Sequence, residues 1–451
     1  MTLRRPLHKL GSVTPNTNPS PAPDTPDSAL LSVQSVQSGP LEEKALARLI
    51  ANRRSGYDPF YRFEYEYSIP SPGRYRWQWF WDSCFHIIAL ARLNPAMAEV
   101  ELNTLLKPQR DDGFIGHLTY WGRRGAVMSA IYGQSRFGEW RRRHSGMIQP
   151  PVLAHALEEL WLQTGDLDLL KKYLPRVRAY YNWLSVERDP EQIGLIGIVS
   201  PYEAGLDNNP SFDRGLGLSN AGRIRILWAN RKLDWYNIVR GKNFDYRTLL
   251  KRDRFVAIDP FMNSVFGDSW AIMARLHEAL GDTSGRESAA RQGEKTTSAL
   301  NERCWDLERG HYTYLIGAGR SPDTTLSVGA IFPLILRDAP KDRVAGVVEQ
   351  YLTAEKHFWR PFPVPSVAAS EPAYNPESEK MIWRGPICMN LNWLLARGLR
   401  AHGYVNEART IADRSKEAAL KDFREFYSPE SGRGMRGTEF GWATAAVAIY
   451  G

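Results

Sequence analysis

The chain has 451 residues, of which 43% are hydrophobic and 24% charged, shares that are typical of a globular protein. No stretch approaches the roughly 18 consecutive apolar residues of a transmembrane helix, so we expect no membrane partner. The net charge is +8, and residues 223–254 hold ten Lys or Arg against three Asp. An excess confined to one segment favours one anionic ligand over a general polyanion. We therefore expect a small-molecule partner and no nucleic acid, and leave a homo-oligomer open.

The cysteines do not indicate a disulfide framework or a metal site. Cys84, Cys304 and Cys388 lie far apart, and the chain contains no CxxC pair or Cys/His zinc spacing. We expect no metal and no cofactor. Few large apolar residues and several Pro steps occur in residues 1–38, which predicts a disordered tail. No apolar run of signal-peptide length follows the first basic residues, so we expect a cytoplasmic protein.

From about residue 40 onward the hydrophobic pattern is helical. Within 149–165 the apolar residues recur at positions i, i+3, i+4, i+7 and i+8, which is one face of a helix. Gly165 is expected to end this helix, and Asp166 or Asp168 to cap the next one over 167–185. The same reasoning predicts helices over 40–54, 82–94, 96–107, 149–165, 167–185, 260–281, 283–304, 325–337, 341–354, 386–402, 405–421 and 439–450.

Twelve helices in six hairpins predict an all-α fold, the (α/α)6 barrel, which is a toroid of six helical hairpins. No alternation of strands and helices competes with this interpretation. The long insertions 108–148, 186–259 and 355–385 would lie at one mouth of the barrel, and residues 39–451 would form a single catalytic domain. An open helical solenoid remains the alternative.

Two segments carry isolated carboxylates beside aromatic residues. Gly205–Asp213 contains Asp207 and Asp213 in a stretch whose Gly, Asn and Pro prevent a regular helix, and Thr438–Trp442 contains a lone glutamate, Glu439. Hydrolysis of a glycosidic bond needs two carboxyl groups, one that protonates the leaving oxygen and one that activates water. With 15 Trp and 20 Tyr in the chain, this combination predicts a carbohydrate-active enzyme.

Aromatic residues also gather at two predicted helix starts. In Tyr75–Ser83, Trp79 or Trp81 would wall a pocket, and Asp82 would either cap the helix or accept hydrogen bonds from sugar hydroxyls. In Met381–Pro386, Pro386 would occupy the first turn of a helix, and Trp383 and Arg384 would face the same mouth or serve packing alone.

Other hydrolytic and nucleotide-binding chemistries lack their motifs. The chain has no P-loop, no HExxH and no GxSxG motif. The near match at Gly267–Ala271 lies within a helical pattern, not at a turn between a strand and a helix, so it does not predict a serine nucleophile.

At these residues the chain resembles glycoside hydrolase family 63, in particular the small bacterial branch that includes mannosylglycerate and glucosylglycerate hydrolases. The matching segments are Trp79–Phe85, Gln109–Phe114, Gln149–Pro151, Glu203–Asp213, Trp383–Pro386 and Glu439–Trp442. The resemblance implies an (α/α)6 barrel and an inverting mechanism, with Asp207 as general acid and Glu439 as general base. It also implies that an Arg and a Tyr six residues apart bind the glycerate carboxylate, and Arg240 and Tyr246 have this spacing. Cys388 stands where the family often has an aromatic residue.

We therefore expect an inverting α-glycoside hydrolase for a small glucoside or mannoside with an anionic aglycone, glucosylglycerate or mannosylglycerate. The alternatives are a neutral α-glucosidase acting on oligosaccharides and a non-catalytic protein that binds sugars or polyanions. The pKa of Asp207 would have to be raised by burial or by a carboxylate such as Glu203 or Asp213. The expected substrate contacts are Tyr75, Trp79, Trp81, Asp82, Gln149, Gly205, Arg240, Tyr246, Trp383, Arg384 and Trp442.

Overall fold

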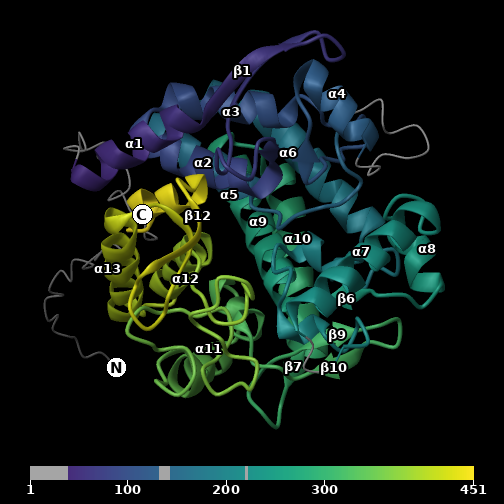
Figure 1. Ribbon diagram of the computed structural model, residues 1–451, viewed down its shortest axis with the longest axis vertical. Helices are drawn as coiled ribbons and strands as arrows, with labels where there is room; N and C mark the ends of the chain where they lie inside the picture. Colours follow the sequence, from purple (N-terminus) through teal and green to yellow (C-terminus); the bar gives the residue numbers. More distant parts are fainter. Residues whose placement is uncertain (1–38, 132–142, 219–221, 451) are drawn as a thin grey trace, which may run out of the picture. The chain divides into compact units, whose positions relative to one another are not determined.

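The structure is a computed structural model that describes residues 39–131, 143–218 and 222–450 (Figure 1). The tail expected over residues 1–38 lies outside these ranges. The described residues belong to one compact unit, Ser38–Gly451. None of their helices is long and apolar enough to cross a membrane.

The described part of the chain is mainly helical. The α-helices are α1 (Pro40–Asn52), α2 (Phe80–Leu93), α3 (Pro95–Leu106), α4 (Gly122–Ile131), α5 (Leu153–Thr164), α6 (Leu167–Glu187), α7 (Arg223–Val239), α8 (Tyr246–Lys251), α9 (Pro260–Ala279), α10 (Thr283–Arg303), α11 (Lys341–Val347), α12 (Met389–Ala401) and α13 (Val405–Lys421). The 3-10 helices are η3 (Pro201–Ala204), η4 (Pro210–Phe212), η5 (Val328–Ala330), η6 (Phe332–Ile335) and η8 (Gly441–Ala448), and η7 (Val348–Leu352) is a π-helix.

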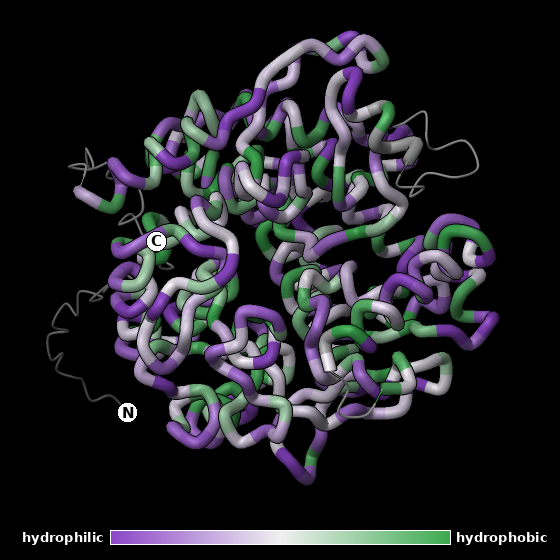
Figure 2. Tube along the Cα trace, in the orientation of Figure 1, coloured by the Kyte–Doolittle hydropathy of each residue, from purple (hydrophilic) through white to green (hydrophobic). Residues whose placement is uncertain are grey.

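An inner set of helices carries the core. Helix α2 contacts α5, α5 contacts α9, α9 contacts η6, η6 contacts α12, α12 contacts η8, and η8 returns to α2. Outside this set, α3 packs on α2 and α5, α6 on α5 and α9, α10 on α9, and α13 on α12. Along α13 hydrophilic and hydrophobic residues alternate (Figure 2), because only one face of this helix meets the core.

Local sequence signals act as expected at the junction of α5 and α6. The predicted apolar face of α5 is buried except at Trp161, which is half-buried. Gly165 ends the helix with a φ of 64°, a left-handed conformation that glycine adopts without strain. The carboxylate of Asp166 accepts hydrogen bonds from the backbone N–H groups of Asp168 and Leu169 and so caps α6. Both expectations are confirmed.

Four predicted helices differ from those observed. Residues 325–337 form only the short η5 and η6, where Pro333 has no N–H to donate to an α-helical bond. Residues 341–354 divide into α11 and the π-helical η7, and 439–450 is 3-10 helix η8. Pro386 does not open a helix, because Cys388 is extended and α12 begins at Met389. Conversely, α4, α7 and α8 lie within segments expected to be irregular insertions.

The strands of the described residues are short, and all their pairings are antiparallel. They are β1 (Arg53–Asp58), β2 (Phe63–Ser68), β3 (Gln78–Trp79), β4 (Leu118–Thr119), β5 (Gly197–Ile198), β6 (Ala257–Ile258), β7 (Trp305–Asp306), β8 (His311–Tyr312), β9 (Tyr314–Ile316), β10 (Ser321–Asp323), β11 (Arg424–Tyr427) and β12 (Gly434–Thr438). One sheet has four strands in the order β10-β9-β6-β5, and the others are two-stranded. The β11–β12 hairpin has a register shift between Arg424 and Phe426.

A second, smaller apolar cluster holds α7 and α8 in place. It contains Met147, Val199, Ile238, Phe244, Tyr246, Leu249 and Val256, which are all buried. Ile238 comes from α7 and Leu249 from α8, so this cluster anchors both helices to the segment that precedes η3. One face of α7 is thereby fixed toward the cavity described next.

Candidate active site

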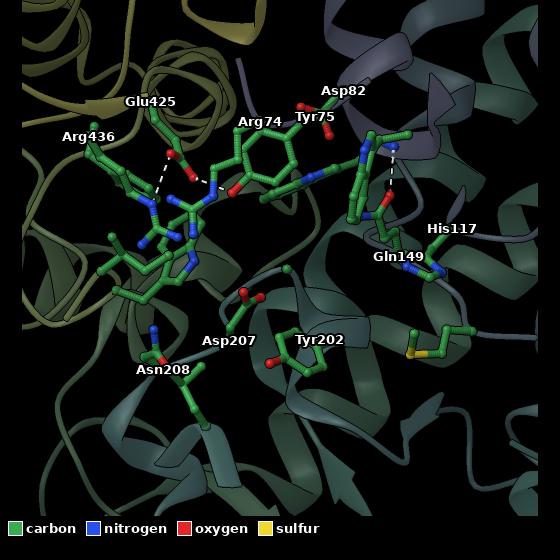
Figure 3. Close-up of a pocket in the computed structure, with 18 of the residues that line it drawn as sticks. Arg74, Tyr75, Asp82, His117, Gln149, Tyr202, Asp207, Asn208, Glu425 and Arg436 are labelled. Carbon is green, nitrogen blue, oxygen red and sulfur yellow. Dashed lines mark hydrogen bonds and ion pairs between the residues drawn. The ribbon is translucent and has the colours of Figure 1, made fainter. Parts of the chain in front are cut away.

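A cavity of about 650 Å³ lies where several distant segments meet, a size usual for a small-molecule site. It is lined by the loop before β3, the start of α2, residues around 147–149, the segment 202–208, one face of α7, the loop 380–383, the β11–β12 hairpin and the start of η8. Figure 3 shows the polar side chains that converge on it.

Indole rings form much of the cavity wall. The ring of Trp81 meets that of Trp442 at a centroid distance of 5.4 Å and that of Trp383 at 6.3 Å. Gly205 has a φ of 68°, and a Cβ atom placed there would come within 2.9 Å of the Trp81 ring. Only glycine therefore allows the backbone of the segment 202–208 to approach this wall closely. Flat apolar walls of this kind suit the faces of a sugar ring.

Asp207 projects into the cavity just after this glycine (Figure 3). Burial raises the pKa of its carboxyl to about 7, against the opposing effect of Arg436; the carboxylates of Glu425 and Asp234 raise it further. Asp207 can therefore hold a proton near neutral pH, which is what a general acid needs.

The carboxylates expected to raise this pKa lie elsewhere. Glu203 is buried in an ion pair with Arg188, whose two nitrogens lie 2.8 and 2.6 Å from its oxygens. Asp213 pairs with Arg384 at 2.6 and 2.8 Å. Each carboxylate is thus neutralised by its own arginine, and Glu425 and Asp234 take the expected role beside Asp207.

Glu425 also lines the cavity, and the sequence interpretation did not identify it. It lies on β11 and is 3% exposed. The Tyr75 hydroxyl donates a hydrogen bond to Oε1 at 2.9 Å, and the Arg436 Nε lies 3.0 Å from Oε2 (Figure 3). Burial raises the pKa of Glu425, whereas Arg436 and Tyr75 lower it by favouring the ionised form. Asp207 and Glu425 face each other across the cavity in Figure 3.

Glu439 does not reach the cavity. Its carboxylate forms an ion pair with Arg48 at 2.6 Å, and its side chain is 44% exposed. Phe440 and Trp442 line the cavity on either side of Gly441, and the backbone at Glu439 turns its side chain away with a φ of 56°. The structure therefore does not support the expected pairing of Asp207 with Glu439.

Three other expected contacts are absent from the cavity wall. Arg240 is exposed just beyond the end of α7, and Tyr246 is buried in the second apolar cluster with its ring against Gly197. Arg384 is 7% exposed and serves the ion pair with Asp213. The spacing of Arg240 and Tyr246 therefore does not bring them to one ligand.

The remaining expected contacts do line the cavity: Tyr75, Trp79, Trp81, Asp82, Gln149, Gly205, Trp383 and Trp442. Asp82 lies in the first turn of α2 and does not cap it, since the N-cap position belongs to Trp79. Burial raises the pKa of Asp82 well above its usual range, and Glu425 adds to this effect. The Gln149 side chain accepts a hydrogen bond from the backbone N–H of Trp81 at 3.1 Å, which ties it to the aromatic wall.

Several cavity residues were not among the expected substrate contacts, namely Arg74, His117, Tyr202, Arg231, Asp234, Lys380, Glu425 and Arg436. Of these, Arg231 and Asp234 lie in the basic segment 223–254 that favoured an anionic ligand. Glu425 precedes Phe426 and Tyr427, so it has the same aromatic setting that singled out Glu439. Asp234 accepts a hydrogen bond from the Ser200 hydroxyl at 2.8 Å, and burial raises its pKa to about 7. Within the described residues, no group of three or more His, Cys, Asp or Glu could hold a metal ion.

Comparisons with known proteins show the family of this chain. Residues 75–443 match the family model described as the mannosylglycerate hydrolase MGH1-like glycoside hydrolase domain. A mannosylglycerate hydrolase of Thermus thermophilus is 28% identical over 413 residues, which cover 82% of this chain and 92% of that protein. A glucosylglycerate hydrolase of Mycolicibacterium hassiacum is 22% identical and covers 81% of this chain and 90% of its own.

The fold is likewise similar to a solved one. The crystal structure of a GH63 mannosylglycerate hydrolase from Thermus thermophilus in complex with glucose has a TM-score of 0.76 and 23% identity, over 91% of this chain and 99% of that one. The family resemblance inferred from the sequence motifs is thus confirmed. The family model spans most of the described residues, and the aromatic and carboxylic residues of the cavity lie within it. The chain therefore belongs to the MGH1-like family of glycoside hydrolases.

Proposed function

We propose that this protein is an inverting α-glycosidase that hydrolyses glycosides of glycerate, with Asp207 as general acid and Glu425 as general base. The observation that carries the assignment is that these two carboxyl groups face each other across the cavity in different surroundings (Figure 3). Burial raises the pKa of both groups, to about 7 for Asp207, while the Tyr75 hydroxyl and the Arg436 guanidinium contact Glu425 directly and favour its ionised form. Acid and base roles in one site need one carboxyl group that keeps its proton and one that can be ionised.

The mechanism follows from this arrangement. The sugar ring lies among Trp81, Trp383 and Trp442. Asp82 lines the same cavity and contacts the hydroxyl groups of the sugar. Asp207 donates its proton to the glycosidic oxygen as the bond to the anomeric carbon breaks. Glu425 takes a proton from a water molecule, which attacks the anomeric carbon from the opposite face and inverts it. An inverting pair needs room for this water, so a separation of about 6.5–9.5 Å is expected between the carboxyl groups in the complex.

We also infer that the helices close into an (α/α)6 barrel and that residues 39–451 form a single catalytic domain. The continuous contacts from α2 through α5, α9, η6, α12 and η8 back to α2 support this inference. In this arrangement η6 and η8 take the places of two inner helices.

The test compares three carboxylate variants on α-mannosylglycerate and α-glucosylglycerate. Asp207→Asn and Glu425→Gln should each lower kcat by about 10²–10⁴-fold, the usual contribution of a general acid or base. Glu439→Gln is the matched control, because Glu439 is a glutamate with an arginine partner outside the cavity, and it should retain activity. Circular dichroism should show all three variants folded, and NMR of the first product should show the inverted anomer.

Other outcomes would contradict the assignment in distinct ways. Loss of activity in Glu439→Gln with retention in Glu425→Gln would reject Glu425 as the base. Equal kcat/KM values on neutral α-glucosides would favour an oligosaccharide α-glucosidase. Binding of heparin without hydrolysis of any glycoside would favour a non-catalytic polyanion-binding protein.

A further inference from the structure

Three basic side chains line the cavity without an ion pair or a side-chain hydrogen bond to another described residue. Arg74, Arg231 and Lys380 form no ion pair and no side-chain hydrogen bond with any other residue in the described ranges. The fourth cation of the cavity, Arg436, is paired with Glu425. The arginine of the buried pair nearby, Arg384, is likewise matched by a carboxylate. The cavity therefore contains both paired and unpaired cations.

The carboxyl groups of the cavity neutralise these cations only in part. Burial raises the pKa of Asp207 and of Asp234 to about 7, and that of Asp82 well above its usual range. Near pH 7, Asp207 and Asp234 are each about half ionised and together contribute about one negative charge. The ion pair with Arg436 offsets the charge of the ionised form of Glu425. Arg74, Arg231 and Lys380 bring three positive charges, so a net positive charge of about two remains in the cavity.

These three cations come from separate parts of the chain. Arg74 lies in the loop before β3, Arg231 on α7 and Lys380 in the loop that leads to α12. On α7, Trp235 lines the cavity one turn after Arg231, whereas the neighbouring Lys232 does not. The second apolar cluster holds α7 with this face toward the cavity. Convergence from three elements distinguishes this group from a solvated basic stretch of a single helix.

A glycerate aglycone carries one negative charge, which one guanidinium can bind in a two-pronged contact. We propose that Arg74, Arg231 and Lys380 form a subsite for an aglycone with two or more negative charges, namely a glycerate that also carries a phosphate monoester. Arginine suits phosphate oxygens through its planar pair of donors, and lysine adds a mobile point charge. This inference rests on the proposed function, in which the glycosidic bond is hydrolysed and the phosphate ester stays intact.

The test uses two glycosides that differ only in the phosphate. We expect kcat/KM for the α-glycoside of phosphoglycerate to exceed that for the α-glycoside of glycerate by at least about tenfold, the effect of one charge-assisted hydrogen bond. Arg231→Met and Lys380→Met should each reduce this preference by about tenfold or more. Lys232→Met is the matched control, since it removes an exposed positive charge from the same helix outside the cavity, and it should leave the preference unchanged.

The outcomes separate this inference from the proposed function. Equal or better hydrolysis of the glycerate glycoside would overturn the phosphate subsite and leave the glycerate function standing. A preference that falls equally in Lys232→Met would also overturn it, because the effect would then come from overall charge. If neither glycoside is hydrolysed, the proposed function fails, and calorimetry of the full chain with phosphoglycerate and with glycerate decides the subsite. Tighter binding of phosphoglycerate, lost in Arg231→Met, supports it, and equal binding overturns it.

Discussion

Replacing Asp207 by asparagine should make the protein more stable at alkaline pH while removing its activity. The pKa of this carboxyl is about 7 in the folded protein, against 3.8 for an ordinary aspartate. Between these values the native state holds a proton that the unfolded chain has released. The free energy of unfolding therefore falls as pH rises from about 4 to about 7, because a charge must be kept in a site that disfavours it.

The size of the effect follows from the shift. About 3 pKa units at 1.36 kcal/mol each give at most about 4 kcal/mol above pH 7. At pH 5 the protein has lost only the smaller part of this free energy of unfolding. The advantage of Asp207→Asn over the unchanged protein should consequently grow by about 2–3 kcal/mol between pH 5 and pH 8.

Urea unfolding followed by tryptophan fluorescence at pH 5, 6, 7 and 8 measures this difference. Asp111→Asn serves as the control, since Asp111 is exposed and outside the cavity, and its effect should not change with pH. A pH-independent difference between Asp207→Asn and the unchanged protein would refute the argument that burial raises this pKa. The case for Asp207 as the general acid would then lose its main support.

Two further substitutions test how the cavity is built. Gly205→Ala should lower kcat/KM and destabilise the protein by about 1–2 kcal/mol, because a side chain there meets the Trp81 ring and requires a left-handed backbone; unchanged kinetics would show that the wall can move. Arg188→Met should destabilise the protein by about 3–5 kcal/mol in urea unfolding, since it leaves Glu203 buried without its partner. In the double variant, Glu203→Gln removes the unpaired charge and should restore part of the stability that Arg188→Met loses. If it restores none, the broken ion pair is not the cause of the loss.

Local signals in the sequence determined much of the helical scaffold. Apolar residues at helical spacing, Gly165 and Asp166 are enough to define α5, α6 and the turn between them, because caps and amphipathic faces act within a few residues. The aromatic residues before α2 and the aspartate Asp207 after Gly205 were also recognisable as cavity residues, since each stands among residue types that a structural role alone does not require. The helical hydrophobic pattern was weaker on α7, because its large apolar residues Ile224, Trp228 and Trp235 are exposed and do not belong to one buried face.

The choice between Glu425 and Glu439 depended on the tertiary structure. Both glutamates stand beside aromatic residues in the sequence, so composition and spacing cannot separate them. Pairing of β11 with β12 brings Arg436 against Glu425 and turns Glu425 into the cavity, while the left-handed turn after β12 sends Glu439 toward Arg48. The raised pKa of Asp207 also depends on the tertiary structure, because segments more than a hundred residues away help to bury this side chain. The sequence by itself determined which kinds of side chain the proposed chemistry uses, and only the packing of distant segments decided which of them share one cavity.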